Sequence, residues 1–165
     1  MSIEQDFDQY NAQFDRVEWL KGVAPGKMGA WEASAAGGDM RAQFLCAKVL
    51  QTGAAGETDL RRALFFYEKA AEQGLGAAMV NAGRLLMQGA RGDKDVEGAM
   101  GYYQSAADMG YSSGLYNIGL LLTEGREVPK DLPRALEIWT QLEREGAKGA
   151  AQYRKQVWEQ LIGQE

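Results

Sequence analysis

The chain has 165 residues, a length that suits one compact domain, and its 45% hydrophobic and 25% charged residues are typical of a folded globular protein. It contains no histidine and a single cysteine, Cys46, which argues against zinc sites, thiol or histidine catalysis and an internal disulfide. The net charge of −5 argues against binding to nucleic acid, and no apolar run is long enough to cross a bilayer.

Residues 3–20 are predicted to form an N-terminal capping helix. Apolar residues recur there at alternating spacings of four and three, which places them on one stripe: Ile3, Phe7, Tyr10, Phe14 and Val17. A terminal element of a repeat array covers its neighbour on one side and faces water on the other. The alternative is that Tyr10, Phe14 or Trp19 faces outward and contacts a partner.

The segment 21–27, KGVAPGK, contains two glycines and a proline and is predicted to be a loop. A helix is expected from Met28 to about Ala36. Helices joined by glycine-rich loops then follow, and the last of them stands alone. Their predicted ranges are 40–52, 60–73, 77–88, 96–109, 113–124, 132–145 and 148–162.

A period of 36 residues relates these elements. An aromatic residue recurs every 36 residues, and a glycine follows each aromatic seven residues later. The aromatics are Trp31, Tyr67, Tyr103 and Trp139, and the glycines are Gly38, Gly74, Gly110 and Gly146. Such self-similarity indicates a repeat array whose helix pairs bury their apolar faces by stacking. The sequence therefore predicts an all-α solenoid of antiparallel helix pairs, with about four repeats and a capping helix at each end.

Other positions in the same register predict how each repeat is closed. An aspartate precedes the second helix of each pair, where its carboxylate can accept hydrogen bonds from the first helical amides. These residues are Asp59, Asp95 and Asp131. We interpret them as helix caps and not as metal ligands, because each lies in a different repeat and no second acid or histidine accompanies it consistently.

Small residues predict where helices approach closely. Gly83 and Gly119 lie inside predicted helices, where glycine costs about 1 kcal/mol relative to alanine. We expect close backbone packing to offset this cost, with the alanine pairs at 70–71 and 106–107 as the matching small surface. Cys46 falls at a position expected to be buried, so its predicted role is packing.

Several of these positions together resemble the SEL-one-like repeat, a relative of the tetratricopeptide repeat. The segments are YEKAAEQG, LLMQG and GLYNIGLLLTEGREVPKDLPRALEIW, and the connector of the last contains Gly125, Val128, Lys130 and Asp131. The resemblance covers residues 28–162, which leaves 1–27 as the capping helix and loop and 163–165 as a tail. It implies a right-handed superhelix whose first helices line a concave face. The sequence departs from the family pattern at Ala47, Arg154 and Lys155.

The concave face is the predicted binding surface. If the recurring small and leucine positions face the core, the opposite stripe of each first helix faces the concavity. We predict that these residues contact a partner: Leu45, Lys48, Thr52, Asn81, Arg84, Gln88, Tyr116, Asn117, Leu120, Glu124 and Tyr153. The alternative is that they are only solvated.

The function predicted from these features is a non-enzymatic, cytoplasmic protein-binding module without a cofactor or metal. The resemblance to small free-standing bacterial arrays suggests an immunity protein that inhibits a cognate toxin or secreted effector, and the acidic charge would speed association with a basic toxin. One alternative is a general adaptor or assembly scaffold with several partners. A distant alternative is a hydrolase that uses carboxylates alone, with Glu124 and Glu127 as candidates. The sequence does not determine the oligomeric state.

Overall fold

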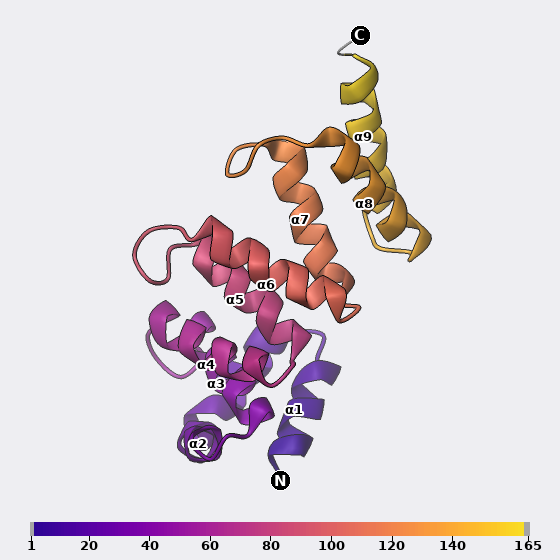
Figure 1. Cartoon of the computed structure of the whole chain (residues 1–165). Coiled ribbons are helices and arrows are strands. Elements are labelled where there is room, and N and C mark those ends of the chain that lie inside the picture. The colour runs from indigo at the N-terminus through magenta and orange to yellow at the C-terminus, as the bar shows by residue number, and fades with distance from the viewer. Residues whose placement is uncertain (1, 164–165) are drawn as a thin grey trace. The chain divides into compact units, whose positions relative to one another are not determined.

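The structure is a computed structural model that describes residues 2–163, and over this range it is all-helical, as predicted (Figure 1). The chain divides into two compact units, Met1–Lys94 and Asp95–Glu165, which are described separately. Of the predicted tail, only Gly163 lies within the described residues.

Unit 1 contains five helices, which pack in sequence, each against the next. These are α1 (Ile3–Ala12), α2 (Arg16–Ala36), α3 (Met40–Thr52), α4 (Leu60–Glu72) and α5 (Gly76–Met87). The first helix also packs against α3, so it covers the start of the array on two neighbours.

The described part of unit 2 contains four helices with the same sequential packing. These are α6 (Val96–Asp108), α7 (Ser112–Glu124), α8 (Leu132–Arg144) and α9 (Ala150–Ile162). Helices α8 and α9 lie side by side as an antiparallel pair (Figure 1). From α3 to α9, each helix begins and ends within two residues of its predicted bounds.

The N-terminal region differs from the prediction of one helix over residues 3–20. Helix α1 ends at Ala12, and the Asp15 side chain caps a new helix by accepting a hydrogen bond from the Glu18 amide at 3.0 Å. The break leaves Phe14 fully exposed, with 107% of its reference area accessible. The apolar stripe therefore serves two separate helices, and Phe14 belongs to neither of their buried faces.

The predicted loop at residues 21–27 is also wrong, because α2 runs through it with Pro25 inside the helix. A proline in a helix removes one hydrogen bond and strains the preceding turn. Leu20, Ala24, Trp31 and Ala35 nevertheless recur at helical spacing and are buried. Packing of this stripe outweighs the local cost of Pro25, which lies on the exposed side.

A buried polar contact fixes α1 on α2. The Asp6 side chain is buried, accepts a hydrogen bond from the Trp31 indole nitrogen at 2.9 Å and forms an ion pair with Lys27. A buried carboxylate requires partners of this kind, since leaving it unpaired would cost several kcal/mol, roughly 3–5.

The recurring positions have their predicted structural roles. All four aromatics of the register are buried, and Ala63, Ala99 and Ala135 are fully buried. Asp59, Asp95 and Asp131 each accept a hydrogen bond from the amide three residues later, at 2.8–3.0 Å. Gly38, Gly74, Gly110 and Gly146 have positive φ values of 77–94°, as their places after helix ends require. Cys46 is fully buried, and burial raises the pKa of its thiol to about 12.

The close approach of helices in unit 2 occurs at two glycines with different neighbours. A Cβ atom on Gly114 would overlap the Tyr103 carbonyl oxygen and lie 2.8 Å from the Ala107 nitrogen, so here α7 touches the α6 backbone. A Cβ atom on Gly119 would instead lie 2.9 Å from the Trp139 ring. The predicted contact of Gly119 with the 106–107 alanines is therefore wrong, because Gly114 occupies that position.

We predict that Gly114→Ala lowers the free energy of unfolding by about 1–3 kcal/mol, the usual cost of overpacking. Gly101→Ala on α6 is the matched control, because no atom lies within 4 Å of a Cβ at that exposed helical position. The control is expected to gain up to about 1 kcal/mol from helix propensity. Chemical denaturation of both variants measures the difference, and equal stabilities would contradict the close approach of α6 and α7.

Candidate protein-binding surfaces

The predicted partner-binding residues lie on the first helices of the repeats or directly after them, except Tyr153 on α9, and the structure leaves all but two of them exposed or half-buried. Leu45 is fully buried and is not part of any accessible surface, because the buried stripe of α3 is wider than the recurring positions indicated. Asn81 is 8% exposed. The accessible residues, with Asn81, form two first-helix surfaces. The unit 1 surface contains Lys48, Thr52, Asn81, Arg84 and Gln88, and the unit 2 surface contains Tyr116, Asn117, Leu120, Glu124 and Tyr153.

Lys48 is the centre of the unit 1 surface. Its ammonium donates a hydrogen bond to Asn81 Oδ1 at 3.0 Å and lies over the Phe44 and Tyr67 rings, 5.5 and 5.6 Å from their centroids. Asn81 is held in turn by donation from its Nδ2 to the Ala77 carbonyl at 2.7 Å. The lysine therefore has a defined position across α3, α4 and α5.

The electrostatic surroundings of Lys48 are unfavourable to its charge. Burial, together with the nearby cations Arg84 and Arg16, lowers the pKa of Lys48 to about 8. The contribution of Arg16 was not foreseen. Arg16 is the first residue of α2 and lies outside the 36-residue repeat, so no sequence pattern linked it to α3.

The remaining residues of the unit 1 surface are less constrained by partners. Arg84 on α5 and Gln88 directly after it are exposed, and neither side chain has a hydrogen-bond or ion-pair partner among residues 2–163. Thr52 is half-buried, and its hydroxyl donates to the Lys48 carbonyl at 2.8 Å. Arg84 and Gln88 are thus available to another molecule, whereas the Thr52 hydroxyl is already used within its own helix.

The unit 2 surface is built around an aromatic cluster. The Tyr153 ring stacks on buried Trp139 with centroids 4.5 Å apart, and Tyr116 meets Trp139 edge-on at 5.0 Å. Burial and a hydrogen bond with Tyr153 raise the pKa of the Tyr116 hydroxyl. Both tyrosines therefore pack against the core while each keeps part of its surface accessible.

Asn117, Leu120 and Glu124 complete the unit 2 surface on α7. Asn117 Nδ2 donates to the Ser113 carbonyl at 2.7 Å, the same arrangement that Asn81 has in α5. Its Oδ1 has no partner within the described chain, so it can accept a hydrogen bond from another molecule. Leu120 is half-buried and Glu124 is exposed, which gives this surface an apolar centre with a charged edge.

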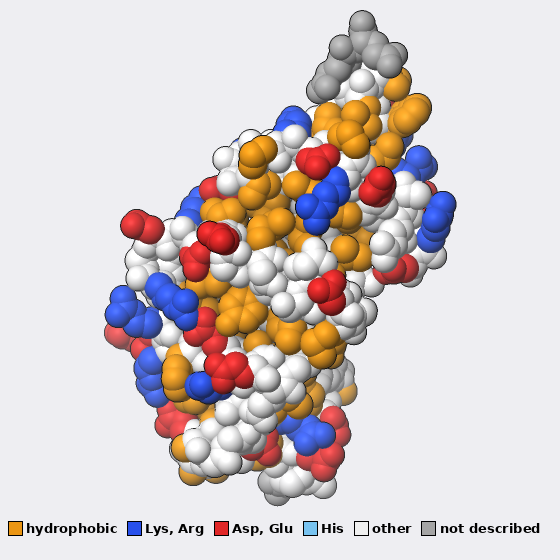
Figure 2. Space-filling view, viewed as in Figure 1, with side chains coloured by type: hydrophobic (Ala, Val, Ile, Leu, Met, Phe, Trp, Pro, Cys, Tyr) orange, Lys and Arg blue, Asp and Glu red, His pale blue; other side chains and the backbone are white. Residues whose placement is uncertain are grey.

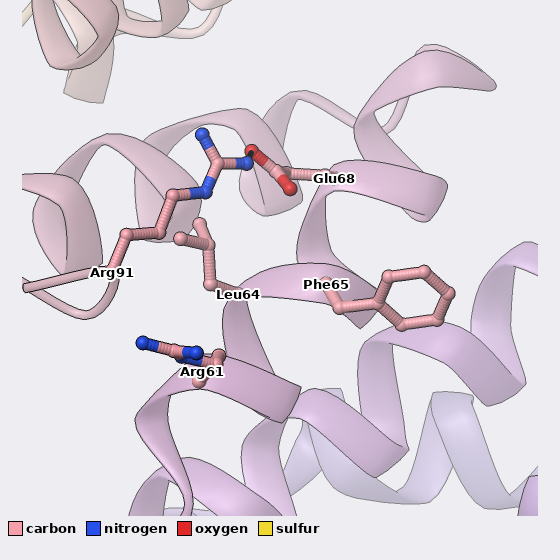
Figure 3. A pocket seen from close by; sticks show the side chains of 5 residues that line it. All are labelled: Arg61, Leu64, Phe65, Glu68 and Arg91. Atoms are coloured by element: carbon pink, nitrogen blue, oxygen red, sulfur yellow. Dashed lines mark hydrogen bonds and ion pairs between the residues drawn. The ribbon is translucent and has the colours of Figure 1, made fainter.

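Two further surface features were not predicted. Figure 3 shows a shallow pocket of about 410 Å³ in unit 1, where Arg61 and Arg91 lie on either side of Leu64. Arg91 forms an ion pair with Glu68, while the 54% exposed ring of Phe65 points away from both arginines. In unit 2, hydrophobic side chains are exposed over α9 (Figure 2), among them Trp158 and Ile162. Neither feature recurs with the repeat, which is why periodicity did not indicate them.

Within residues 2–163, no group of three or more acidic, histidine or cysteine side chains has the geometry of a metal site. None of the described helices is both long and apolar enough to span a bilayer.

The position of Lys48 predicts a pH dependence of stability. Between pH 8 and 10.5 the unfolded chain retains a proton on Lys48 that the folded chain has lost, so this residue makes the folded state more stable as pH rises. We expect the stability advantage of Lys48→Met over the native chain to be largest at pH 7. It should decline through this window by at most about 1.4 kcal/mol per pH unit. Parallel urea denaturation at several pH values tests this, and a constant difference would show that the Lys48 pKa is not lowered.

Comparison with known proteins places these surfaces in a family context. The Sel1 repeat model matches three consecutive segments, residues 41–75, 76–111 and 112–145. Each match begins at or within one residue of a first helix, so Lys48, Arg84 and Leu120 occupy equivalent places in successive repeats. The three matched repeats are fewer than the four or so predicted, and residues 28–40 and 146–162 of the predicted array lie outside the match.

Two solved structures are similar to this chain. A protective antigen of uropathogenic Escherichia coli strains that displays an SLR fold has a TM-score of 0.73 and 27% sequence identity, covering 79% of this chain and 28% of the other. A Sel1 repeat protein from Oxalobacter formigenes has a TM-score of 0.68 and 27% identity, covering 75% of this chain and 49% of the other. This chain therefore spans less than half the length of either protein.

Comparison of the sequence with functionally curated proteins gives no match. Because the Sel1 repeat model matches more than half of its residues, this chain belongs to the Sel1 repeat family, the SEL-one-like relatives of the tetratricopeptide repeat.

Proposed function

We propose that this protein is a non-enzymatic module that holds one specific partner protein on its first-helix surfaces. Sel1 repeats generally mediate protein–protein interactions, and the scaffold is typically non-catalytic. The observation that carries the proposal is a contrast between buried and accessible positions along each first helix. Positions equivalent to Cys46 are buried in all three repeats, whereas positions equivalent to Lys48 stay accessible and change from lysine to arginine to leucine.

The accessible positions offer the chemistry that protein interfaces use. Tyrosine and arginine are enriched in such interfaces, and Tyr116, Tyr153 and Arg84 supply both residue types. The partly accessible tyrosines are already held by Trp139, so little side-chain entropy is lost when a partner covers them. The surfaces therefore combine rigid aromatic anchors with adaptable polar groups.

Within this class we propose a bacterial immunity protein that neutralises a cognate toxin or effector, in preference to a general adaptor with several partners. Support comes from the likeness to Sel1 repeat proteins of bacteria and from the net charge of −5, which would speed association with a basic toxin. We propose a cytoplasmic location with it, for a toxin that acts in the cytoplasm of the cell that is protected.

We expect the tagged chain to retain a single dominant protein from extracts of its own cells. Leu120→Glu on α7 should weaken this complex at least about tenfold, because a charge would be buried at the apolar centre of the unit 2 surface. Leu136→Glu on α8 is the matched control, since Leu136 is also a half-buried leucine but lies on a second helix. Affinity capture followed by titration, with melting curves of both variants, makes the comparison.

Repeated capture without a stable protein partner would refute the binding function, and loss of binding in the Leu136→Glu control alone would move the interface to the second helices. The immunity role has its own test. The captured protein should arrest bacterial growth when expressed alone and become harmless when this chain is co-expressed. Capture of several partners, none of them toxic, would favour a general adaptor.

A further inference from the structure

We propose that the unit 1 surface receives a carboxylate-bearing segment of the partner protein, with Arg84 and Lys48 donating hydrogen bonds to that carboxylate. Arg16 contributes positive potential at the same place. This inference rests on the proposed function, because it specifies the chemistry that the partner presents. It concerns one surface of unit 1 and the residues that face it.

The first observation is an excess of positive charge without a counter-ion. Arg16, Lys48 and Arg84 come from α2, α3 and α5, and both arginines are close enough to disfavour the charge of Lys48. None of the three forms an ion pair with any described acidic residue. Six other cations of unit 1 do so, although Arg61 does not: Lys21, Lys27, Arg41, Arg62, Lys69 and Arg91.

This excess is notable in a chain with a net charge of −5. Acidic residues are abundant enough to compensate these cations, yet none of the described ones forms an ion pair with Arg16, Lys48 or Arg84. Like charges brought together without compensation cost free energy in the unbound protein. A bound anion would remove that cost. Uncompensated like charges are therefore expected at a binding site whose ligand supplies the opposite charge.

The second observation concerns the donors that remain free. The Lys48 ammonium has three donors, of which Asn81 Oδ1 accepts one, while Phe44 and Tyr67 lie beneath it without accepting a conventional hydrogen bond. The Arg84 guanidinium is exposed and has no partner among the described residues. Its planar fork suits a carboxylate, which it can hold through two parallel hydrogen bonds.

The third observation separates a protein carboxylate from a nucleic acid phosphate. Single-stranded nucleic acids are held by exposed aromatic faces on which bases stack. The aromatics here cannot offer such faces, because Tyr10, Phe44 and Tyr67 are all buried. The overall negative charge would also repel a long nucleic acid, whereas a short acidic segment of a protein meets mainly the local positive patch.

The test uses the full chain and acidic peptides. We expect fluorescein-labelled hexaglutamate to bind at low salt and hexaglutamine not to bind, with binding weakened by added salt. Arg84→Glu should reduce hexaglutamate affinity at least about tenfold, the equivalent of one charge-assisted hydrogen bond. Lys48→Gln should also weaken it, and serves as the second variant if Arg84→Glu lowers the melting temperature.

Arg134→Glu on α8 is the matched control for charge. Arg134 is exposed, its side chain has no partner among the described residues, and the substitution changes the net charge by the same amount. A loss caused only by long-range repulsion would affect both variants equally and would overturn the proposal. Failure of hexaglutamate to bind would overturn it as well, and stronger binding of oligothymidylate would assign the surface to nucleic acid instead.

The outcome for this site is distinguishable from that for the proposed function. If the chain captures a partner protein that Arg84→Glu retains at native affinity, while Leu120→Glu releases it, the binding function stands and the carboxylate site is refuted. If hexaglutamate binds as expected and Arg84→Glu releases the captured protein while Arg134→Glu retains it, both proposals are supported. Amidation of the peptide C-terminus then tells a terminal carboxylate from a glutamate side chain.

Discussion

The fold depends on small residues at the places where helices cross. Gly119 leaves the space that the Trp139 ring occupies, and the Trp139 indole nitrogen donates to Thr123 Oγ1 at 2.9 Å. The Thr123 hydroxyl in turn donates to the Gly119 carbonyl at 2.7 Å, so packing and hydrogen bonding secure the same crossing of α7 and α8. A helical glycine that costs about 1 kcal/mol in isolation is retained because a buried tryptophan requires its space.

The equivalent crossing in the first repeat is built from different residues. Ala47 replaces the glycine on α3, and the smaller ring of Tyr67 replaces the tryptophan on α4. The Tyr67 hydroxyl donates to Gln51 Oε1 at 2.6 Å, and Gln51 is the positional equivalent of Thr123. At this crossing a larger residue on one helix accompanies a smaller ring on the other, whereas the second repeat combines the smaller ring of Tyr103 with Gly83.

This constraint gives the two sides of each first helix different roles. The side that meets the aromatic and alanine positions is committed to the core, as the complete burial of Cys46, Ala82 and Ile118 shows. The other side contributes little to the fold and can vary from repeat to repeat. Lys48 and Arg84 can therefore form a positive patch in unit 1, whereas Leu120 gives unit 2 an apolar centre. The net charge of the chain affects how fast a partner associates with it. The local charge of each surface affects the stability of the complex once it has formed.

Much of this arrangement follows from the sequence because it repeats. Three copies of the caps and four copies of the left-handed glycines and buried aromatics reveal these positions, since chance agreement over 36-residue shifts is small. The N-terminal region has no second copy. There, Pro25 and the flanking glycines favoured a loop, while the buried stripe from Leu20 to Ala35 makes a helix. Tertiary packing of this stripe outweighs the local preference for a loop, and the local sequence carries no information about that packing.

The candidate surfaces were predictable in part for the same reason. Helical spacing selected Lys48, Arg84 and Asn117 correctly as accessible or partly accessible side chains. It could not show that Leu45 is enclosed, because enclosure depends on how many neighbours a helix has. Helical spacing also could not predict that Arg16 lies near Lys48. That proximity arises from the turn at residues 13–15 and the packing of α1 on both α2 and α3.

Hydroxyl-radical footprinting of the complex with the captured partner tests the central claim most directly. The account predicts protection of Tyr116, Tyr153, Leu120 or the Lys48 region, with Phe65 and Leu136 on the second helices remaining as reactive as in the free chain. Protection confined to Phe65 and Leu136, with the first-helix surfaces unchanged, would contradict it.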